Sequence, residues 1–334
     1  MTAGSPHLIR RLVIAVAVLS VLLTASILLG LSAGAAGGGW QVVWQSLLGG
    51  DTGLLGDIIW RLRLPRVLLS ALVGATLSLA GLVFQALLRN PLAEPYILGV
   101  SGGSAIGAII GILLGLSRFP GVWATAFAGS LATLAVLFLM VSGRSMFKTH
   151  SLLLSGVMVN AFCSAVIMFL VSMAQDSRLH NIIFWLMGDL AAATNDTVLG
   201  LAATVVPCFI VIFFRSHTMN LMALGSDMAS TMGVNIKFTS ALLLIVTSLM
   251  VSATVSFCGL VGFVGLVTPH MLRMILGPDH RLLVPASILG GATFLVVCDL
   301  LARVLPSQGE IPVGVITALI GAPLFIFLLR KSQR

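Results

Sequence analysis

Few residues of this sequence have the types and spacing that catalysis or nucleotide binding requires. Lys148-Thr149 comes closest to a nucleotide-binding motif, because a P-loop ends in Gly-Lys followed by Thr or Ser. Phe147 stands where that motif needs glycine, so we expect no P-loop. No nucleophile and base occur in a catalytic arrangement either. We therefore expect no enzyme, and ATP that drives this protein must be hydrolysed by another subunit.

The cysteines and histidines show no metal-ligand spacing. The four cysteines all lie inside apolar runs, where cysteine behaves as a small buried hydrophobic residue, so we expect no disulfides: Cys163, Cys208, Cys258 and Cys298. We predict no metal site and no bound cofactor.

The composition is that of a membrane protein. Of 334 residues, 58% are hydrophobic and only 8% are charged, and no soluble domain of this size can hide so much apolar surface. The net charge of +8 is scattered singly between apolar runs, which indicates membrane topology rather than a nucleic-acid surface. No shift in composition suggests a second domain, so we expect a single transmembrane domain over residues 1–334.

Ten apolar runs are long enough, or nearly so, for the roughly 20 residues that a bilayer demands of a helix. They lie at Leu12–Leu31, Val67–Leu88, Tyr96–Leu116, Gly121–Ser142, Ser151–Met173, Thr197–Phe214, Phe238–Cys258, Gly259–Leu276, Leu282–Val304 and Pro312–Leu329. Pro269 should bend or shorten the eighth. We expect Gln175–Asp189 to form a short helix outside the membrane.

The charges between the spans predict the topology. Twelve of the 18 lysines and arginines fall on the side that holds both chain ends, and six fall on the other. The positive-inside rule then places both termini in the cytoplasm. No ionisable residue lies near the middle of a run, whereas a proton- or ion-driven carrier needs such groups. A secondary carrier or channel without an ATPase is therefore the less favoured alternative.

Glycine recurs at every fourth residue through the third run, from Gly99 to Gly115. Such a ridge lets two helix backbones approach closely where hydrophobicity cannot drive association. We expect the ridge to pack against another helix of the same subunit. The alternative is that it lines a transport pathway.

The polar segment Arg215–Lys237 interrupts the apolar runs. Gly225 and Gly233 should divide it into two very short helical pieces, the second with Ser226 as its N-cap, Asp227 in its first turn and Gly233 just past its end. Helices this short are not stable alone, so each must pack against something else.

Methionines mark one face of each predicted piece, at i,i+3 and i,i+4 spacing: Met219 with Met222, and Met228 with Met232. Flexible methionine side chains suit a surface that grips a moving partner. The alternative is a short helix lying on the membrane surface.

Leu224-Gly225, Ala229 and Gly233 resemble the coupling helices of the iron-siderophore, heme and cobalamin permease family of ABC importers, with Met232 where leucine is expected. The resemblance extends along nearly the whole chain, through Asn90–Pro95, Gly99–Ser101, Gly262–Arg273 and Glu310–Lys331.

This resemblance implies an all-α, cobalamin-permease-like fold of ten transmembrane helices in the bacterial inner membrane. It implies a homodimer with the pathway on its two-fold axis, lined by the fifth and tenth spans. Two ATPase subunits would dock on Arg215–Lys237, and a periplasmic binding protein would deliver cargo to the opposite mouth. The cytoplasmic gate would lie near Thr149, His150 and Ser151.

Basic residues cluster at Arg61–Arg66, on the side that should be poor in arginine. Arg63, Arg66 and Arg303 resemble the family's periplasmic arginines, which meet glutamates of the binding protein. The alternatives are snorkelling at a helix end and, for Arg303, neutralisation by Asp299 four residues earlier.

The cargo is expected to be large and partly apolar, because no charge at depth is available to hold a highly charged substrate. Heme, cobalamin and ferric siderophores all fit, and the overall run of sequence most resembles the heme permeases. Met158, Met168 and Met173 in the fifth run are candidates for soft contacts to heme iron, with ordinary core packing as the alternative.

Overall fold

The computed structural model describes residues 6–33, 43–45, 48, 53–141, 149–306 and 309–332, and every regular element within these ranges is helical. Within these ranges, seven helices are long and apolar enough to cross a membrane, and three apolar helices are shorter. Together they lie at the places of the ten predicted spans. The helices are α1 (Pro6–Ser32), α3 (Gly53–Ile58), α4 (Leu64–Leu87), α5 (Val100–Leu113), α6 (Trp123–Val141), α7 (Thr149–Ser172), α8 (Asp176–Leu186), α9 (Asn195–Ala223), α10 (Ser226–Thr231), α11 (Ile236–Cys258), α12 (Val264–Leu276), α13 (His280–Val304) and α14 (Val313–Ser332).

Helix α4 forms the centre of the bundle, packed against α9, α11, α12 and α13. Two glycine contacts explain how its neighbours come so close. A Cβ atom on Gly74 would collide with the carbonyl oxygen of Gly291 in α13, and one on Gly81 would collide with that of Gly265 in α12. Backbone therefore lies directly on backbone at both crossings, as is typical of helices that associate within a bilayer.

The glycine ridge of α5 packs against α6, which confirms the prediction of a helix contact within the subunit. Cβ atoms on Gly103 and Gly107 would collide with the backbone of Gly129 and Thr125 in α6. Gly99 and Gly115 lie at the two ends of the ridge, and a Cβ atom on Gly99 would lie 3.4 Å from Thr133 in α6. They have left-handed φ angles of 74° and 72°, and they flank the two ends of α5.

Helices α5 and α12 are short because a single 3₁₀ turn (Pro95–Leu98) precedes α5, and non-helical backbone at residues 259–263 precedes α12. These two segments are joined to each other: the Tyr96 hydroxyl donates to the Val261 carbonyl (2.8 Å) and accepts from its N–H (3.0 Å). Glu94 Oε1 accepts from the Phe263 N–H at 3.2 Å. Non-helical backbone is tolerated within a membrane protein when its polar groups are satisfied by protein. The predicted shortening of the eighth span is confirmed, although Pro269 lies inside α12 rather than at its start.

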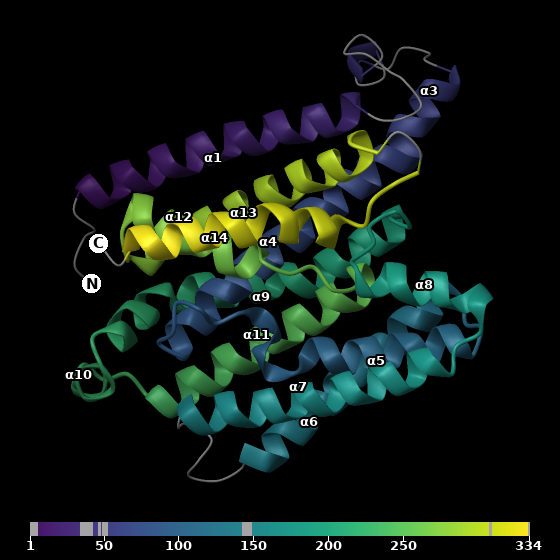
Figure 1. Ribbon diagram of the computed structural model, residues 1–334. Helices are drawn as coiled ribbons and strands as arrows, with labels where there is room; N and C mark the ends of the chain where they lie inside the picture. The colour runs from purple at the N-terminus through teal and green to yellow at the C-terminus, as the bar shows by residue number, and fades with distance from the viewer. Residues whose placement is uncertain are drawn as a thin grey trace.

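The ends of the described chain lie together (Figure 1). The start of α1 and the end of α14 are at the same end of the bundle as α10, and α8 lies at the opposite end. We call these the α10 end and the α8 end. Helix α8 is the short helix predicted within Gln175–Asp189.

Candidate functional site

The segment between α9 and α11 differs from the prediction at its start. Helix α9 continues as one helix from Asn195 to Ala223, so the first of the two predicted short pieces is the end of a 29-residue helix. Arg215 and the polar residues after it did not end the helix, since helix breakers are absent until Gly225. The end of α9 therefore extends nine residues beyond the predicted span.

The second short piece is α10, and its C-terminal cap is as predicted. Gly233 follows the C-cap with a φ of 84° and donates its N–H to the Ser230 carbonyl (3.0 Å). The Val234 N–H donates to the Ala229 carbonyl (3.0 Å), which completes a Schellman motif. The N-cap is Gly225, with a φ of 119°, and not Ser226.

Helix α10, together with Leu224 before it and Met232 after it, presents a sharply two-sided surface. Ala229 is fully buried against the bundle, whereas Leu224, Met228 and Met232 are 62%, 56% and 57% exposed. Asp227 is also exposed, and Met222 is half-buried. This exposed apolar face is the candidate coupling surface.

Met219 does not belong to this surface. It is only 2% exposed and packs in the main hydrophobic core. The i,i+3 spacing with Met222 is present, but the extension of α9 turns Met219 into the bundle. The predicted pairing of these two methionines on an exposed face is therefore wrong.

Asn220 holds the end of α9 against the start of α13. Its Nδ2 donates to Asp279 Oδ1 (2.6 Å), and its Oδ1 accepts from the His280 N–H (2.8 Å). Burial alone would raise the pKa of Asp279, but hydrogen bonds from Arg281 and Asn220 outweigh it and lower the pKa to about 2. The carboxylate is therefore ionised at neutral pH and caps α13 from outside the span.

At the α8 end, Asp299 is the centre of a buried ion-pair network. Its carboxylate is fully buried and pairs with Arg66 Nε (2.9 Å) and Arg303 Nε (3.1 Å). Arg66 also pairs with the half-exposed Glu310 (2.6 Å). Asp299 therefore neutralises Arg303, which was one of the alternatives for this arginine in the sequence analysis.

Arg303, together with Arg63, also caps the C-terminal end of α1. Arg63 Nη1 donates to the Leu31 carbonyl (2.8 Å), and both Nη atoms of Arg303 lie 3.2 Å from the Gly30 carbonyl. The last carbonyls of a helix lack intrahelical partners, so these contacts stabilise the end of α1. Arg63, Arg66 and Arg303 are all buried, and Arg61 is the exposed arginine of the cluster. Direct docking by the three remains a prediction, and it would require them to leave these partners.

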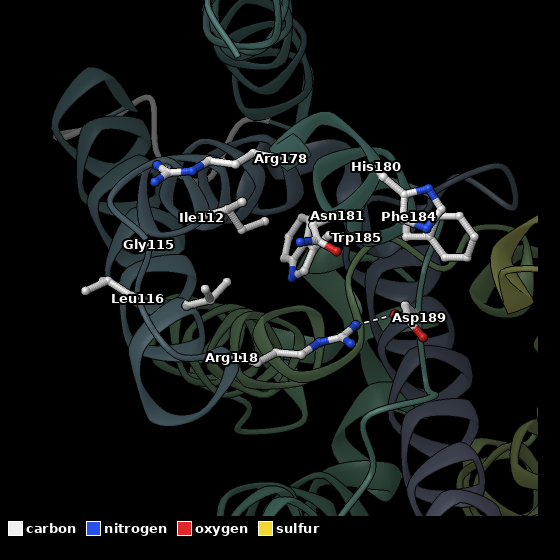
Figure 2. Close-up of a pocket in the computed structure, with 11 residues that line it drawn as sticks. Ile112, Gly115, Leu116, Arg118, Arg178, His180, Asn181, Phe184, Trp185 and Asp189 are labelled. Carbon is white, nitrogen blue, oxygen red and sulfur yellow. Dashed lines mark hydrogen bonds and ion pairs between the residues drawn. The ribbon is translucent and has the colours of Figure 1, made fainter. Parts of the chain in front are cut away.

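A pocket of about 470 Å³ opens beside α8 (Figure 2). Figure 2 shows Arg118 directed at Asp189, with which it forms an ion pair, while Arg178 extends away from that pair. Ile112, Leu116 and Trp185 supply apolar walls. Two arginines and one aspartate give the pocket a positive balance, which favours acidic groups over basic ones.

The predicted gate residues Thr149, His150 and Ser151 begin α7. Their side chains lie outside the part of the chain that the structure describes. Their role remains a prediction.

The bundle, with its capped and exposed helix at one end, is that of an ABC-importer permease. The model of the FecCD transport family matches residues 22–331, and the chain belongs to this family. It is a multi-pass membrane permease.

The chain is similar to two named permeases and to one solved structure. It is 42% identical over 276 residues to the cobalamin import system permease protein BtuC of Halobacterium salinarum, covering 83% of this chain and 74% of that protein. It is 38% identical over 320 residues to the vitamin B12 import system permease protein BtuC of Citrobacter koseri, covering 95% and 94%. A solved inward-facing structure described as a metal-chelate type ABC transporter superposes with a TM-score of 0.85 at 32% identity, covering 95% of this chain and 98% of the other.

Proposed function

We propose that the chain is the permease of a binding-protein-dependent importer that carries a corrinoid into the cell, driven by ATP hydrolysis on partner subunits. The observation that supports the coupling role is the α10 surface. Met228 and Met232 project from a helix that is capped at Gly233 and seated on the bundle through Ala229, and Leu224, the C-cap of α9, is exposed beside them. A short rigid helix with an exposed methionine face is suited to a groove on an ATPase.

A second copy of the chain is part of this proposal. Helix α7 is predominantly apolar, yet only 17% of its most hydrophobic stretch is buried. In a homodimer, α7 and α14 would line a pathway on the two-fold axis, and two ATPase subunits would dock on the two copies of α10. The lipid bilayer would cover the outer helices, and we expect no nucleic-acid partner.

The α10 end would face the cytoplasm, with both termini, in the inner membrane. The twelve basic residues on that side support this orientation. A periplasmic binding protein would then dock at the α8 end. Arg61, whose side chain is 80% exposed, would present its charge there, while Arg63, Arg66 and Arg303 support the same surface from beneath.

The relatives support a corrinoid more than the heme expected from the sequence. Two permeases named for cobalamin import are 42% and 38% identical to this chain over most of their lengths. Heme is the second candidate because of the methionines of the fifth span. Met158 and Met168 in α7, and Met173 just after it, are 60%, 73% and 65% exposed, so they are not packed in the core of the single chain.

The cargo is tested by uptake into proteoliposomes that contain the permease and its ATPase, with ATP inside and the binding protein outside. Cyanocobalamin, heme and a ferric siderophore are offered separately. We expect ATP-dependent accumulation of cyanocobalamin and little of the other two. Accumulation of heme or ferric siderophore without cyanocobalamin would overturn the corrinoid assignment and leave the importer architecture intact.

A further inference from the structure

Arg89 lies just beyond the end of α4 in an unusual backbone conformation. Its φ is +48°, in the left-handed region that residues other than glycine seldom adopt. The cause is local, because Arg89 ends α4 as the left-handed residue of a Schellman-type turn in which the Asn90 N–H donates to the Gln85 carbonyl (3.2 Å). The side chain of Arg89, by contrast, makes contacts outside α4.

The guanidinium group of Arg89 connects the two helices on either side of Gly225. Its Nη2 donates to the Met222 carbonyl (3.2 Å), near the end of α9, and to Ser226 Oγ (3.2 Å), the first residue of α10. A cation is favoured at the C-terminal carbonyls of α9 because those carbonyls carry the negative end of the helix dipole. Gly225 makes the corner between the helices with a φ of 119°, and no atom of the described residues lies within 4 Å of where its Cβ would be. The corner is thus an open glycine hinge bridged by one arginine.

The segment that follows Arg89 lies against α7. The carbonyl oxygen of Ile97 occupies the space where Gly156 of α7 would carry a Cβ, and a Cβ on Gly99 would lie 2.8 Å from Val159 Cγ1. These are contacts of backbone with a helix surface, so the segment and α7 cannot slide past each other without rearrangement. Arg89 therefore links two parts of the chain. Its side chain bonds to the first residue of α10, and the backbone segment that follows it touches α7.

We propose that Arg89 is a positioning residue for energy coupling. It fixes the corner between α9 and α10 to the end of α4, so that a displacement of α10 moves residues 90–98 and, through them, α7. This proposal rests on the proposed function, in which an ATPase moves α10 and α7 lines the pathway. Neither the cargo nor the nucleotide touches Arg89 in this mechanism.

The first test needs no partner and no cargo. Hydrogen exchange is measured on the purified permease and on the Arg89→Ala variant. Loss of a charge-assisted hydrogen bond should raise the exchange rates of amides in 223–234 about fivefold, with α11 and α13 unchanged. Arg61→Ala, which removes an exposed arginine paired with Asp57 at the other end of the bundle, should leave 223–234 unchanged. If Arg89→Ala leaves the exchange rates of amides in 223–234 unchanged, Arg89 does not hold the corner between α9 and α10.

The second test measures coupling in the reconstituted importer as molecules of cargo accumulated per ATP hydrolysed. Arg89→Ala should lower this ratio about fivefold while ATPase association stays normal. Ser226→Ala, which leaves the Met222 carbonyl in place, should have a smaller effect, and it should add nothing to Arg89→Ala because both act on one contact. The proposal would be wrong if Arg89→Ala lowered cargo uptake and ATP hydrolysis in the same proportion. It would also be wrong if the effects of Arg89→Ala and Ser226→Ala on the ratio simply added in the double variant. If the wild-type complex fails to take up cargo, the proposed function fails instead, and the exchange experiment alone decides the role of Arg89 as a bridge.

Discussion

Replacing Met228 with glutamate should abolish ATP-driven uptake while the permease still folds and inserts. The Met228 side chain is 56% exposed on α10, so the substitution costs the isolated permease little. In the complex, the carboxylate would enter an apolar contact with the ATPase. Burying an unpaired charge there costs several kcal/mol, enough to reduce the occupancy of the docked state by more than tenfold.

The matched control for this prediction is Met228→Gln, which has the same length as glutamate and no charge. It should retain much more uptake than Met228→Glu. Uptake and ATPase co-purification are measured for both variants in reconstituted complexes. Normal uptake with normal ATPase association in Met228→Glu would show that the ATPase does not cover this face.

Replacing Asp299 with alanine should destabilise the permease strongly. The fully buried carboxylate balances two buried guanidinium groups, those of Arg66 and Arg303. Breaking a buried ion pair by removing one partner typically costs about 3–5 kcal/mol, because an uncompensated charge stays behind. The variant should unfold at a clearly lower temperature in detergent, or fail to accumulate in the membrane.

Glu310→Gln is the control for this cluster. Glu310 also pairs with Arg66, but its side chain is 45% exposed, and water can replace it. Its loss should cost no more than about 1 kcal/mol. Equal unfolding temperatures for Asp299→Ala and the wild type would show that Asp299 does not hold this end of the bundle together.

The transmembrane architecture could be predicted because its signals are local. The apolar runs located the ten helices, since a helix in a bilayer satisfies its own backbone and needs only sufficient length. Glycine signals were equally reliable. Gly233 ended α10, and the four-residue repeat through Gly103 and Gly107 identified the face of α5 that meets α6.

The end of α9 was mispredicted because hydropathy was taken to mark the end of the helix. The apolar run stops at Phe214, and the helix continues through polar residues to Ala223. Polarity ends a membrane span, whereas a helix ends only where its backbone is interrupted. The burial of Met219 follows from this difference.

The partners of the arginines could not be predicted, because they come from distant parts of the sequence. Arg66 and Asp299 are 233 residues apart, and nothing near Arg66 indicates a carboxylate. Of these pairs, only that of Asp299 with Arg303 could be predicted from the sequence, because the two residues are four positions apart on one helix. Arg89 carried no local signal, since its left-handed φ and its two acceptors exist only in the folded chain.

The location of the ATPase contact is tested most directly by photo-crosslinking from position 228 in membranes that contain the assembled importer. A photoreactive amino acid replaces Met228, and in a control it replaces Val21, which is 68% exposed on α1. We expect a crosslinked product of permease and ATPase from position 228 and none from position 21. A product from position 21 and none from position 228 would contradict the assignment of α10 as the coupling surface.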